Sequence, residues 1–348
     1  MRSVRGISAT GVLLALLLAA AVTVAVVVVV THDTAGSGGS GLGREFDYTL
    51  SRLGRIDPAL IVCEQVAELP SGLAEARAVA AGADGRIYLA GDRAVRILPA
   101  GAATRPARGV REIALDAEPQ ALAVAADGTV YVGLADHVQV YGAGGARQAV
   151  WPPPGEGALL GSVAVGESDV FLADIGNKVV LRYGLDGRLR GWIGQKDPSR
   201  DIPGFSLPSG HLDLAMGPDG LLRATNPGRA RVETYTAGGD LELSWGRPGN
   251  AIEAFCGCCN PVNIAVDADG RVVTCEKGLR RVKLYDAHGK FLGVVAGPDS
   301  FGGVERASGE GAGPLRVLDV AVDPEGRIWV LDTHDGIVRV FAGKAAAP

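Results

Sequence analysis

The chain has 348 residues, of which 47% are hydrophobic and 21% are charged, and its formal net charge is −5. This length and apolar content suffice to bury the core of one large domain. The acidic balance argues against a sequence-independent nucleic-acid platform, because such a surface needs an excess of basic side chains. We therefore expect no nucleic-acid partner. The 51 glycines are typical of a fold with many short strands and tight turns.

The N-terminal 31 residues have the pattern of a membrane anchor. Residues 11–30 are apolar but for one threonine, and twenty such residues can span the hydrocarbon core as a helix. Arg2 and Arg5 precede this run, so the positive-inside rule predicts a single-pass protein of the cell membrane, with a cytoplasmic N-terminus and an extracytoplasmic remainder. A cleaved signal peptide is the alternative, since Ala19–Ala21 supplies the small residues that a cleavage site needs.

Six copies of one unit fill most of the remaining chain. Each copy has an apolar strand, a turn usually built on Asp-Gly or Glu-Gly, a second strand, a polar turn and a third strand. The last copy reads VLDVAVDPEGRIWVLDTHDGIVRVF at 317–341. A fourth strand can follow in most copies, as at 188–193 and 290–295. The other five copies span 76–98, 120–141, 161–183, 212–235 and 262–285.

A period of roughly 40–55 residues is typical of four-stranded propeller blades. The sequence therefore predicts an all-β, six-bladed β-propeller over residues 56–345, joined to the anchor by a flexible Gly/Ser-rich tether at 32–55. The last copy lacks a fourth strand after Phe341, although a propeller ring must close. We expect residues 59–67, which alternate like a strand, to form the outer strand of the last blade and to protect its edge.

The repeated pattern resembles the NHL-repeat family of β-propellers. The matching features are an IAVD-like first strand, a DG turn, a VYVAD-like second strand and an RVxVY-like third strand, over about residues 75–342. The GCCNP stretch at 257–261, followed by the EKG turn at 276–278, resembles an exported bacterial group of these proteins. The resemblance implies the fold and no particular activity, because propellers host enzymes, binding platforms and scaffolds alike.

Long connections precede the fourth, fifth and sixth blades, at 194–210, 247–261 and 297–316. In a propeller these connections share a face with the turns between second and third strands, so they should surround one mouth of the central channel. We expect this face to bind a protein or a small-molecule ligand. The candidate residues are Arg77, Asp213, Asn263 and Asp319 at inner-strand starts, where Ser162 holds the corresponding place, with Glu276 and Lys277 in a neighbouring turn.

The polar residues at the inner-strand starts have two interpretations. They either line a hydrated channel mouth or form a ligand or cation site, for which calcium would suit the oxygen ligands. A second divalent-metal possibility, zinc, comes from the cysteines.

Four of the five cysteines are expected to converge on the same face, by strand order alone: Cys256, Cys258, Cys259 and Cys275. Outside the cytoplasm the first interpretation is a disulfide, for instance between Cys275 and one of the others. A metal or redox centre is the second, with His211 as a further ligand, and free thiols are the third. Cys63, on the outer strand, is expected to be a packed thiol.

These features predict a membrane-tethered, extracytoplasmic β-propeller that acts as a binding or assembly module. The sequence contains no nucleophile elbow, P-loop or recognisable acid pair, so no catalytic residue is assigned. The alternative is a metal-dependent lyase or hydrolase, or a redox or metal accessory protein that uses the cysteine cluster.

Overall fold

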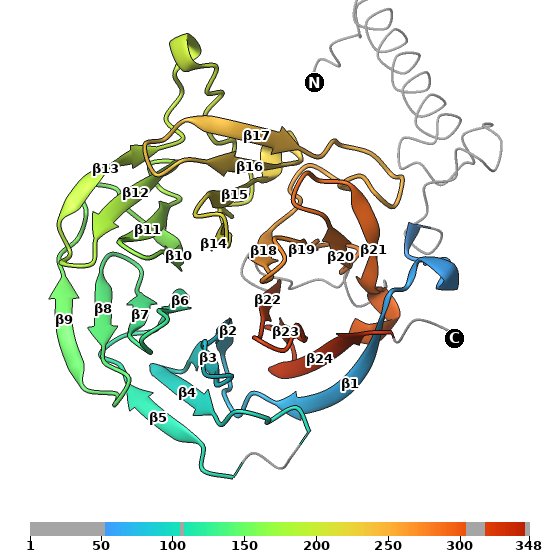
Figure 1. The fold of residues 1–348 in the computed structure, drawn as a ribbon, viewed down its shortest axis with the longest axis horizontal. Helices are drawn as coiled ribbons and strands as arrows, with labels where there is room; N and C mark the ends of the chain where they lie inside the picture. The colour runs from blue at the N-terminus through green and yellow to red at the C-terminus, as the bar shows by residue number, and fades with distance from the viewer. Residues whose placement is uncertain (1–52, 105–107, 304–316, 345–348) are drawn as a thin grey trace, which may run out of the picture. The chain divides into compact units, whose positions relative to one another are not determined.

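The computed structural model describes residues 53–104, 108–303 and 317–344. They form six four-stranded antiparallel sheets, which are the blades of a β-propeller around a central channel (Figure 1). The predicted all-β, six-bladed propeller is therefore confirmed. The expected anchor at residues 11–30 lies outside the described residues, and within the described ranges no helix is long and apolar enough to cross a membrane.

Each blade runs from an inner strand at the channel to an outer strand at the rim. Blade one is β2 (Ala76–Ala81), β3 (Ile87–Gly91), β4 (Ala94–Leu98) and β5 (Arg111–Ala114). Blade two is β6 (Ala121–Val124), β7 (Val130–Gly133), β8 (Val138–Tyr141) and β9 (Arg147–Trp151). Blade three is β10 (Leu160–Val165), β11 (Asp169–Asp174), β12 (Val179–Gly184) and β13 (Leu189–Ile193).

The other three blades follow the same order. Blade four is β14 (Leu214–Met216), β15 (Leu222–Asn226), β16 (Arg231–Tyr235) and β17 (Leu241–Trp245). Blade five is β18 (Asn263–Val266), β19 (Val272–Cys275), β20 (Val282–Tyr285) and β21 (Phe291–Ala296). Blade six is β22 (Leu318–Val322), β23 (Ile328–Asp332), β24 (Ile337–Gly343) and β1 (Cys63–Pro70). Four short 3-10 turns are also described: Pro58–Leu60, Pro198–Arg200, Pro227–Arg229 and Pro298–Phe301.

In five of the six blades the turn between the first and second strands is built by an acidic residue and a glycine. In blade five the Asp267 carboxylate accepts the backbone N–H groups of Asp269 and Arg271, at 2.9 and 2.8 Å. Gly270 completes this turn with a φ of 80°, a left-handed conformation that glycine adopts without a Cβ clash. These turns lie at the opposite end of the blades from the long connections, because each inner strand starts where a connection arrives.

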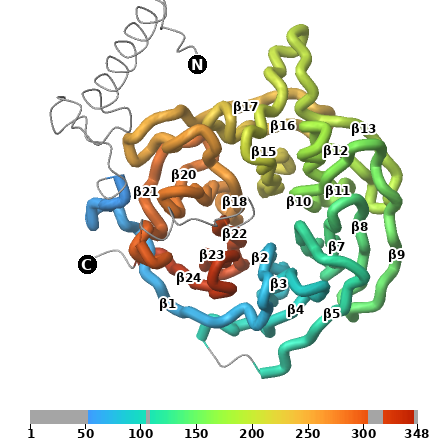
Figure 2. Tube along the Cα trace, turned by 180° about the vertical axis from the view of Figure 1, so that it is seen from behind, coloured from blue at the N-terminus to red at the C-terminus, as the bar shows by residue number. Residues whose placement is uncertain are grey.

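The ring is closed by the N-terminal strand β1, which pairs antiparallel with β24 from Cys63 opposite Gly343 to Pro70 opposite Ile337. Figure 2 shows β1 (blue) along the outside of the red last blade. The sequence placed this strand at 59–67, but it begins later because Pro58–Leu60 forms a 3-10 turn. The Asp57 carboxylate caps that turn by accepting the N–H of Ala59.

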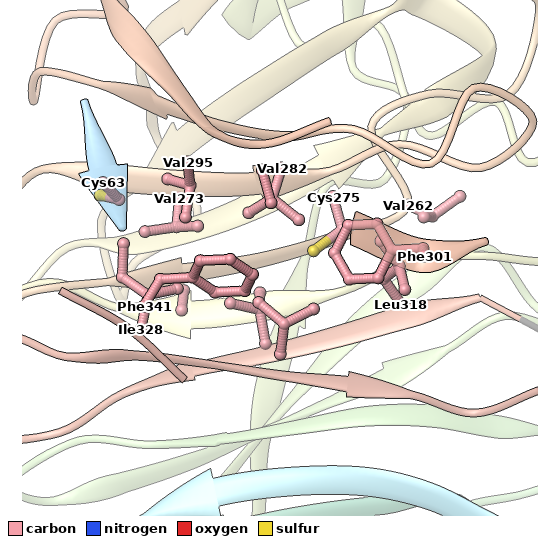
Figure 3. Close-up of a cluster of buried hydrophobic side chains, with 14 residues drawn as sticks. Cys63, Val262, Val273, Cys275, Val282, Val295, Phe301, Leu318, Ile328 and Phe341 are labelled. Atoms are coloured by element: carbon pink, nitrogen blue, oxygen red, sulfur yellow. The ribbon is translucent and has the colours of Figure 1, made fainter. Parts of the chain in front are cut away.

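The hydrophobic core is divided among the six interfaces between neighbouring blades. One apolar cluster fills each interface, and the cluster between blades five and six is shown in Figure 3. Val273 and Val282 enter it from blade five, whereas Ile328 and Phe341 enter it from blade six. Cys63 also belongs to this cluster, which confirms the packed thiol expected there. No blade buries both its faces alone, so the ring folds as one unit.

Candidate functional site at the channel mouth

A cavity of about 350 Å³ opens at the end of the channel where the inner strands begin. All six inner strands or the residues just before them line it, so the site is made by the closed ring rather than by one blade. Its volume lies in the range of small-molecule pockets, and its lining is apolar with a few polar groups. The polar groups are Arg77, Gln120, Ser162, His211, Asp213, Asn263 and Asp319.

The predicted inner-strand residues link one blade to the next by hydrogen bonds. Asp213 of blade four accepts the backbone N–H of Ile264 in blade five, at 2.7 Å. Asp319 of blade six accepts the backbone N–H of Val79 in blade one, also at 2.7 Å. The Asn263 amide of blade five donates to the Leu318 carbonyl of blade six, and the Ser162 hydroxyl of blade three accepts the N–H of Leu214 in blade four. The residue that begins an inner strand therefore fixes the neighbouring inner strand.

Asp213 and Asp319 also give the cavity its electrostatic character. Burial raises the pKa of Asp213 to about 6, although hydrogen bonds from the Ser162 hydroxyl and from the Ile264 N–H favour its charged form. Burial, and next the negative charge of Asp213, raise the pKa of Asp319 to about 8. The two carboxyl groups thus form an interacting pair that holds about one proton, and carries about one negative charge, at neutral pH. The sequence reasoning found both residues but missed that they interact.

Arg77 lines the cavity but does not share the register of the other inner-strand residues. A bulge lies between Ala76 and Ala78, and the N–H that pairs with Asp319 belongs to Val79. Ala78 is therefore the blade-one equivalent of Asp213, and Arg77 comes one residue earlier. Its guanidinium forms an ion pair with Glu118 at 2.8 Å, across to the connection that enters blade two.

His211 also lines the cavity, as part of the connection that enters blade four. Its Nδ1 lies 3.1 Å from the Ser209 hydroxyl. Neither His211 nor the carboxyl pair lies in a metal-binding group, since the described residues contain no set of three His, Cys, Asp or Glu side chains that could hold a metal ion.

Glu276 has a different position from the one that the sequence suggested. Its side chain is fully buried, does not line the cavity, and forms ion pairs with Arg281 and Lys283. It also accepts the backbone N–H of Cys256 at 3.2 Å. Glu276 therefore anchors the 247–261 insertion through the main chain of Cys256. The adjacent Lys277 is half-buried and holds the same insertion through its main chain, which pairs with the Asn260 amide.

The anchoring role of the second-strand ends recurs around the ring. The Asp92 carboxylate accepts the N–H groups of Ala74 and Glu75, and the Asp174 carboxylate accepts the N–H of Leu159. Asn226 accepts the N–H of Ser206 in the same way. Each of these polar residues ties down the connection that enters its own blade. The sequence showed that they recur but suggested only that they cap turns.

Lys283 is the main anchor that the sequence reasoning missed. Its ammonium group is completely buried and donates to the carbonyls of Ile252 and Ala254, at 3.1 and 2.7 Å. It lies 4.6 Å from the centre of the Phe255 ring, and burial lowers its pKa to about 8. The sequence did contain a signal for this anchor. Lys283 lies in the middle of a third strand, and a lysine buried there needs hydrogen-bond or ionic partners.

The cysteines are not joined in the way that the sequence favoured. All five are free thiols, so the expected disulfide involving Cys275 is not present. Cys275 ends β19 with its sulfur in the apolar cluster beside Phe301, as Figure 3 shows, because alternation along the strand turns it toward blade six. Cys256, Cys258 and Cys259 remain together in the insertion. Of the four thiols that were predicted to converge, three therefore lie in the insertion and the fourth, Cys275, lies in the core.

No protein-family model and no curated protein matches the chain. Among solved structures, a streptogramin B lyase matches with a TM-score of 0.52 and 11% identity, covering 81% of this chain and 97% of that chain. A catalytically inactive virginiamycin B lyase from Staphylococcus aureus, solved with quinupristin, matches with a TM-score of 0.51 and 11% identity, covering 79% and 82%. At this identity the likeness concerns the fold. The class that fold and cavity define is a six-bladed β-propeller with a small-molecule-sized pocket at its channel mouth.

Proposed function

We propose that the protein is a binding module whose ligand site is the channel-mouth cavity. The observation that supports this most strongly is the pair of half-buried carboxyl groups, Asp213 and Asp319, in a cavity to which all six blades contribute. Displaced pKa values cluster at functional sites, so a displaced pair in a concave site is a candidate for function. The residues that would contact a ligand are the polar groups of the cavity named above.

The chemistry of the cavity favours a small organic amine with an apolar body. A protonated amine would compensate the negative charge that the Asp213–Asp319 pair carries at pH 7, and the carboxyl group that is still protonated would ionise on binding. The apolar body would lie against aliphatic side chains such as Leu122, Leu160 and Val163. Arg77 would not oppose the amine strongly, because Glu118 already compensates its charge.

Titration calorimetry of the full chain with benzylamine tests this proposal. We expect saturable binding at pH 7, weakened at least about tenfold by Asp319→Asn, since an uncharged amide loses the ionic contact. The matched control is Asp127→Asn, which alters an exposed turn carboxylate whose contact is the N–H of Thr129. Equal affinity of the Asp319 and Asp127 variants, or no saturable binding to the unaltered chain, would count against the site.

We further propose that the propeller is an NHL-type module held outside the cytoplasm by residues 11–30. The support is the apolar run after Arg2 and Arg5 and the repeat pattern of the six copies. Protease added to spheroplasts should digest the propeller and spare a cytoplasmic marker. A protected propeller would refute the topology, and release of intact protein into the soluble fraction would favour a cleaved signal peptide.

The alternative function is a lyase or hydrolase at the same cavity. It is favoured by a carboxyl pair with unequal pKa values beside His211, because one group could donate a proton while the other accepts one. The two solved structures described above are lyases by name, one of them solved with quinupristin. Incubation with quinupristin, followed by mass spectrometry, tests this directly. Unchanged quinupristin after long incubation would argue against a shared substrate.

A further inference from the structure

Two adjacent thiols lie at the tip of the 247–261 insertion. Cys258 is exposed and Cys259 is half-buried, and their sulfur atoms are 3.1 Å apart. Cys256, the third thiol of the insertion, points elsewhere, since its Sγ contacts the Asn250 side chain at 3.4 Å. The buried Cys63 and Cys275 belong to the core between blades five and six. Only Cys258 and Cys259 therefore form a close pair.

The pair is held in place by contacts on both sides. Before it, the N–H of Cys256 donates to Glu276. After it, the side-chain amide of Asn260 donates to the carbonyls of Cys256 and Lys277, at 2.6 and 3.1 Å, and its oxygen accepts the N–H of Lys277 at 2.8 Å. Asn260 is itself 3% exposed. The stretch between these anchors is short, so the two thiols keep their proximity without relying on their own contact.

The pair also lies beside the channel-mouth cavity. The Ser209 side chain acts on the Cys259 thiol, whose pKa it lowers, and the Ser209 hydroxyl lies 3.1 Å from Nδ1 of His211, which lines the cavity. A small molecule that reaches the cavity mouth therefore passes close to an accessible dithiol. The thiol pair and the cavity residue His211 are thus close in space although they are far apart in the sequence.

We propose that Cys258 and Cys259 form a redox-active dithiol that exchanges with small organic disulfides at the rim of the cavity. The Cys258 thiolate attacks one sulfur of the small disulfide, and the bond between its two sulfurs breaks to release one thiolate. Cys259 then loses its proton and attacks the Cys258 sulfur of the mixed disulfide, which releases the second thiol. The small disulfide gains two electrons and becomes two thiols, while the protein dithiol becomes the Cys258–Cys259 disulfide.

The order of attack follows from exposure. Cys258 is the more accessible sulfur, whereas burial, and then the neighbouring Cys258 thiol, raise the pKa of Cys259. A hydrogen bond from Ser209 and the charge of Lys277 act in the opposite direction and assist the second step. A disulfide between adjacent residues closes a strained ring, and strained disulfides are readily reduced. The product is thus reversible, as an exchange site requires.

The test uses the full chain with Cys256→Ser, in which Cys258 and Cys259 are the only cysteines that are not buried. The probe is 5,5′-dithiobis(2-nitrobenzoate), which releases coloured thionitrobenzoate. We expect about two equivalents to be released and no thionitrobenzoate to remain on the protein, because the second thiol displaces the first adduct. Adding Cys259→Ser should reduce the release to about one equivalent and leave the adduct in place.

Three outcomes would overturn the proposal. Retention of the adduct in the Cys256→Ser chain would show that Cys258 and Cys259 do not close a disulfide. Loss of closure caused by Cys256→Ser itself, relative to the unaltered chain, would assign the exchange to Cys256. No reaction in a chain that unfolds at the normal temperature would show that the thiols are not accessible. Protection of both thiols by phenylarsine oxide, which binds paired thiols, provides an independent positive measurement.

Discussion

Asp213 and Asp319 combine a structural and an electrostatic role in single side chains. Each accepts the backbone N–H of a neighbouring inner strand, and each faces the cavity. The backbone hydrogen bonds favour the ionised carboxylates, whereas burial disfavours them, and burial is the larger effect. Ionisation of these groups therefore lowers the stability of the fold, which makes them candidates for a functional role in addition to their structural one.

This balance predicts an unusual dependence of stability on pH. An aspartate in an unfolded chain titrates near pH 4, whereas the pKa of Asp319 is raised to about 8. Between these values the folded chain holds a proton that the unfolded chain releases, so the free energy of unfolding falls as pH rises. We expect Asp319→Asn to be at least about 1 kcal/mol more stable than the unaltered chain at pH 8, and equal to it near pH 4.

Urea unfolding at both pH values measures this difference. Asp127→Asn is the control, because the N–H of Thr129 lowers the pKa of Asp127 and no gain at high pH should follow. A loss of stability at pH 8 in Asp319→Asn would mean that the ionised carboxylate is needed by the ring.

At the residue scale the sequence predicted positions better than contacts. Asp213, Asn263 and Asp319 could be placed because they share one register in three copies. Arg77 was misplaced by one residue, since the bulge before Ala78 leaves no mark in the sequence pattern. The interaction of Asp213 with Asp319 could not be found, because it joins non-adjacent blades across the channel mouth.

At the scale of elements, the insertion before blade five is shaped by the blade beneath it. Lys283, Glu276 and Tyr285 each bind its main chain, at Ala254, Cys256 and Glu253 respectively. Two of these anchors lie on β20, and Glu276 lies in the turn that precedes it. An insertion held in this way can present its own side chains in a fixed geometry.

Removing the central anchor should weaken both the fold and the insertion. We expect Lys283→Met to cost about 2–3 kcal/mol, because two carbonyls lose their donor and Glu276 keeps only Arg281 as an ion-pair partner. Limited proteolysis should then cut within 247–261 faster than in the unaltered chain.

The control for this change is Arg96→Met, at the same position in blade one. Arg96 is half-buried and donates to the carbonyl of Gly72 at 2.7 Å, so its loss should cost about 1 kcal/mol or less. Equal costs for the Lys283 and Arg96 variants would contradict the anchoring role of Lys283.

The closing strand β1 gives a second prediction at this scale. A chain that starts at residue 71 lacks β1 and leaves β24 as an open edge, whereas a chain that starts at residue 50 keeps it. We expect the shorter chain to aggregate or to melt at a much lower temperature, since open edges promote association. Similar melting temperatures in scanning calorimetry would show that β1 is dispensable.

For the closing strand, the sequence predicted the existence of the strand better than its first residue. Its existence followed from the missing fourth strand of the last copy, but its start was placed four residues early. Proline at position 58 and the Asp57 cap turn the chain there, and both act locally against an extended strand.

At the scale of the whole propeller, the six repeats explain both the stability and the site. Each interface between blades is filled by its own apolar cluster, and each inner strand contributes to the same cavity. The fold could be predicted because a repeated pattern averages over local irregularities. The contacts of the cysteine side chains could not be predicted, because the face of the strand on which Cys275 lies depends on the register of that strand.

A crystal structure of the full chain grown with benzylamine tests the central claim most directly. We expect the amine nitrogen within hydrogen-bond distance of Asp213 and Asp319, with the ring against the aliphatic lining of the cavity. Benzylamine bound elsewhere, or an empty cavity in crystals of a chain that binds benzylamine in solution, would contradict it.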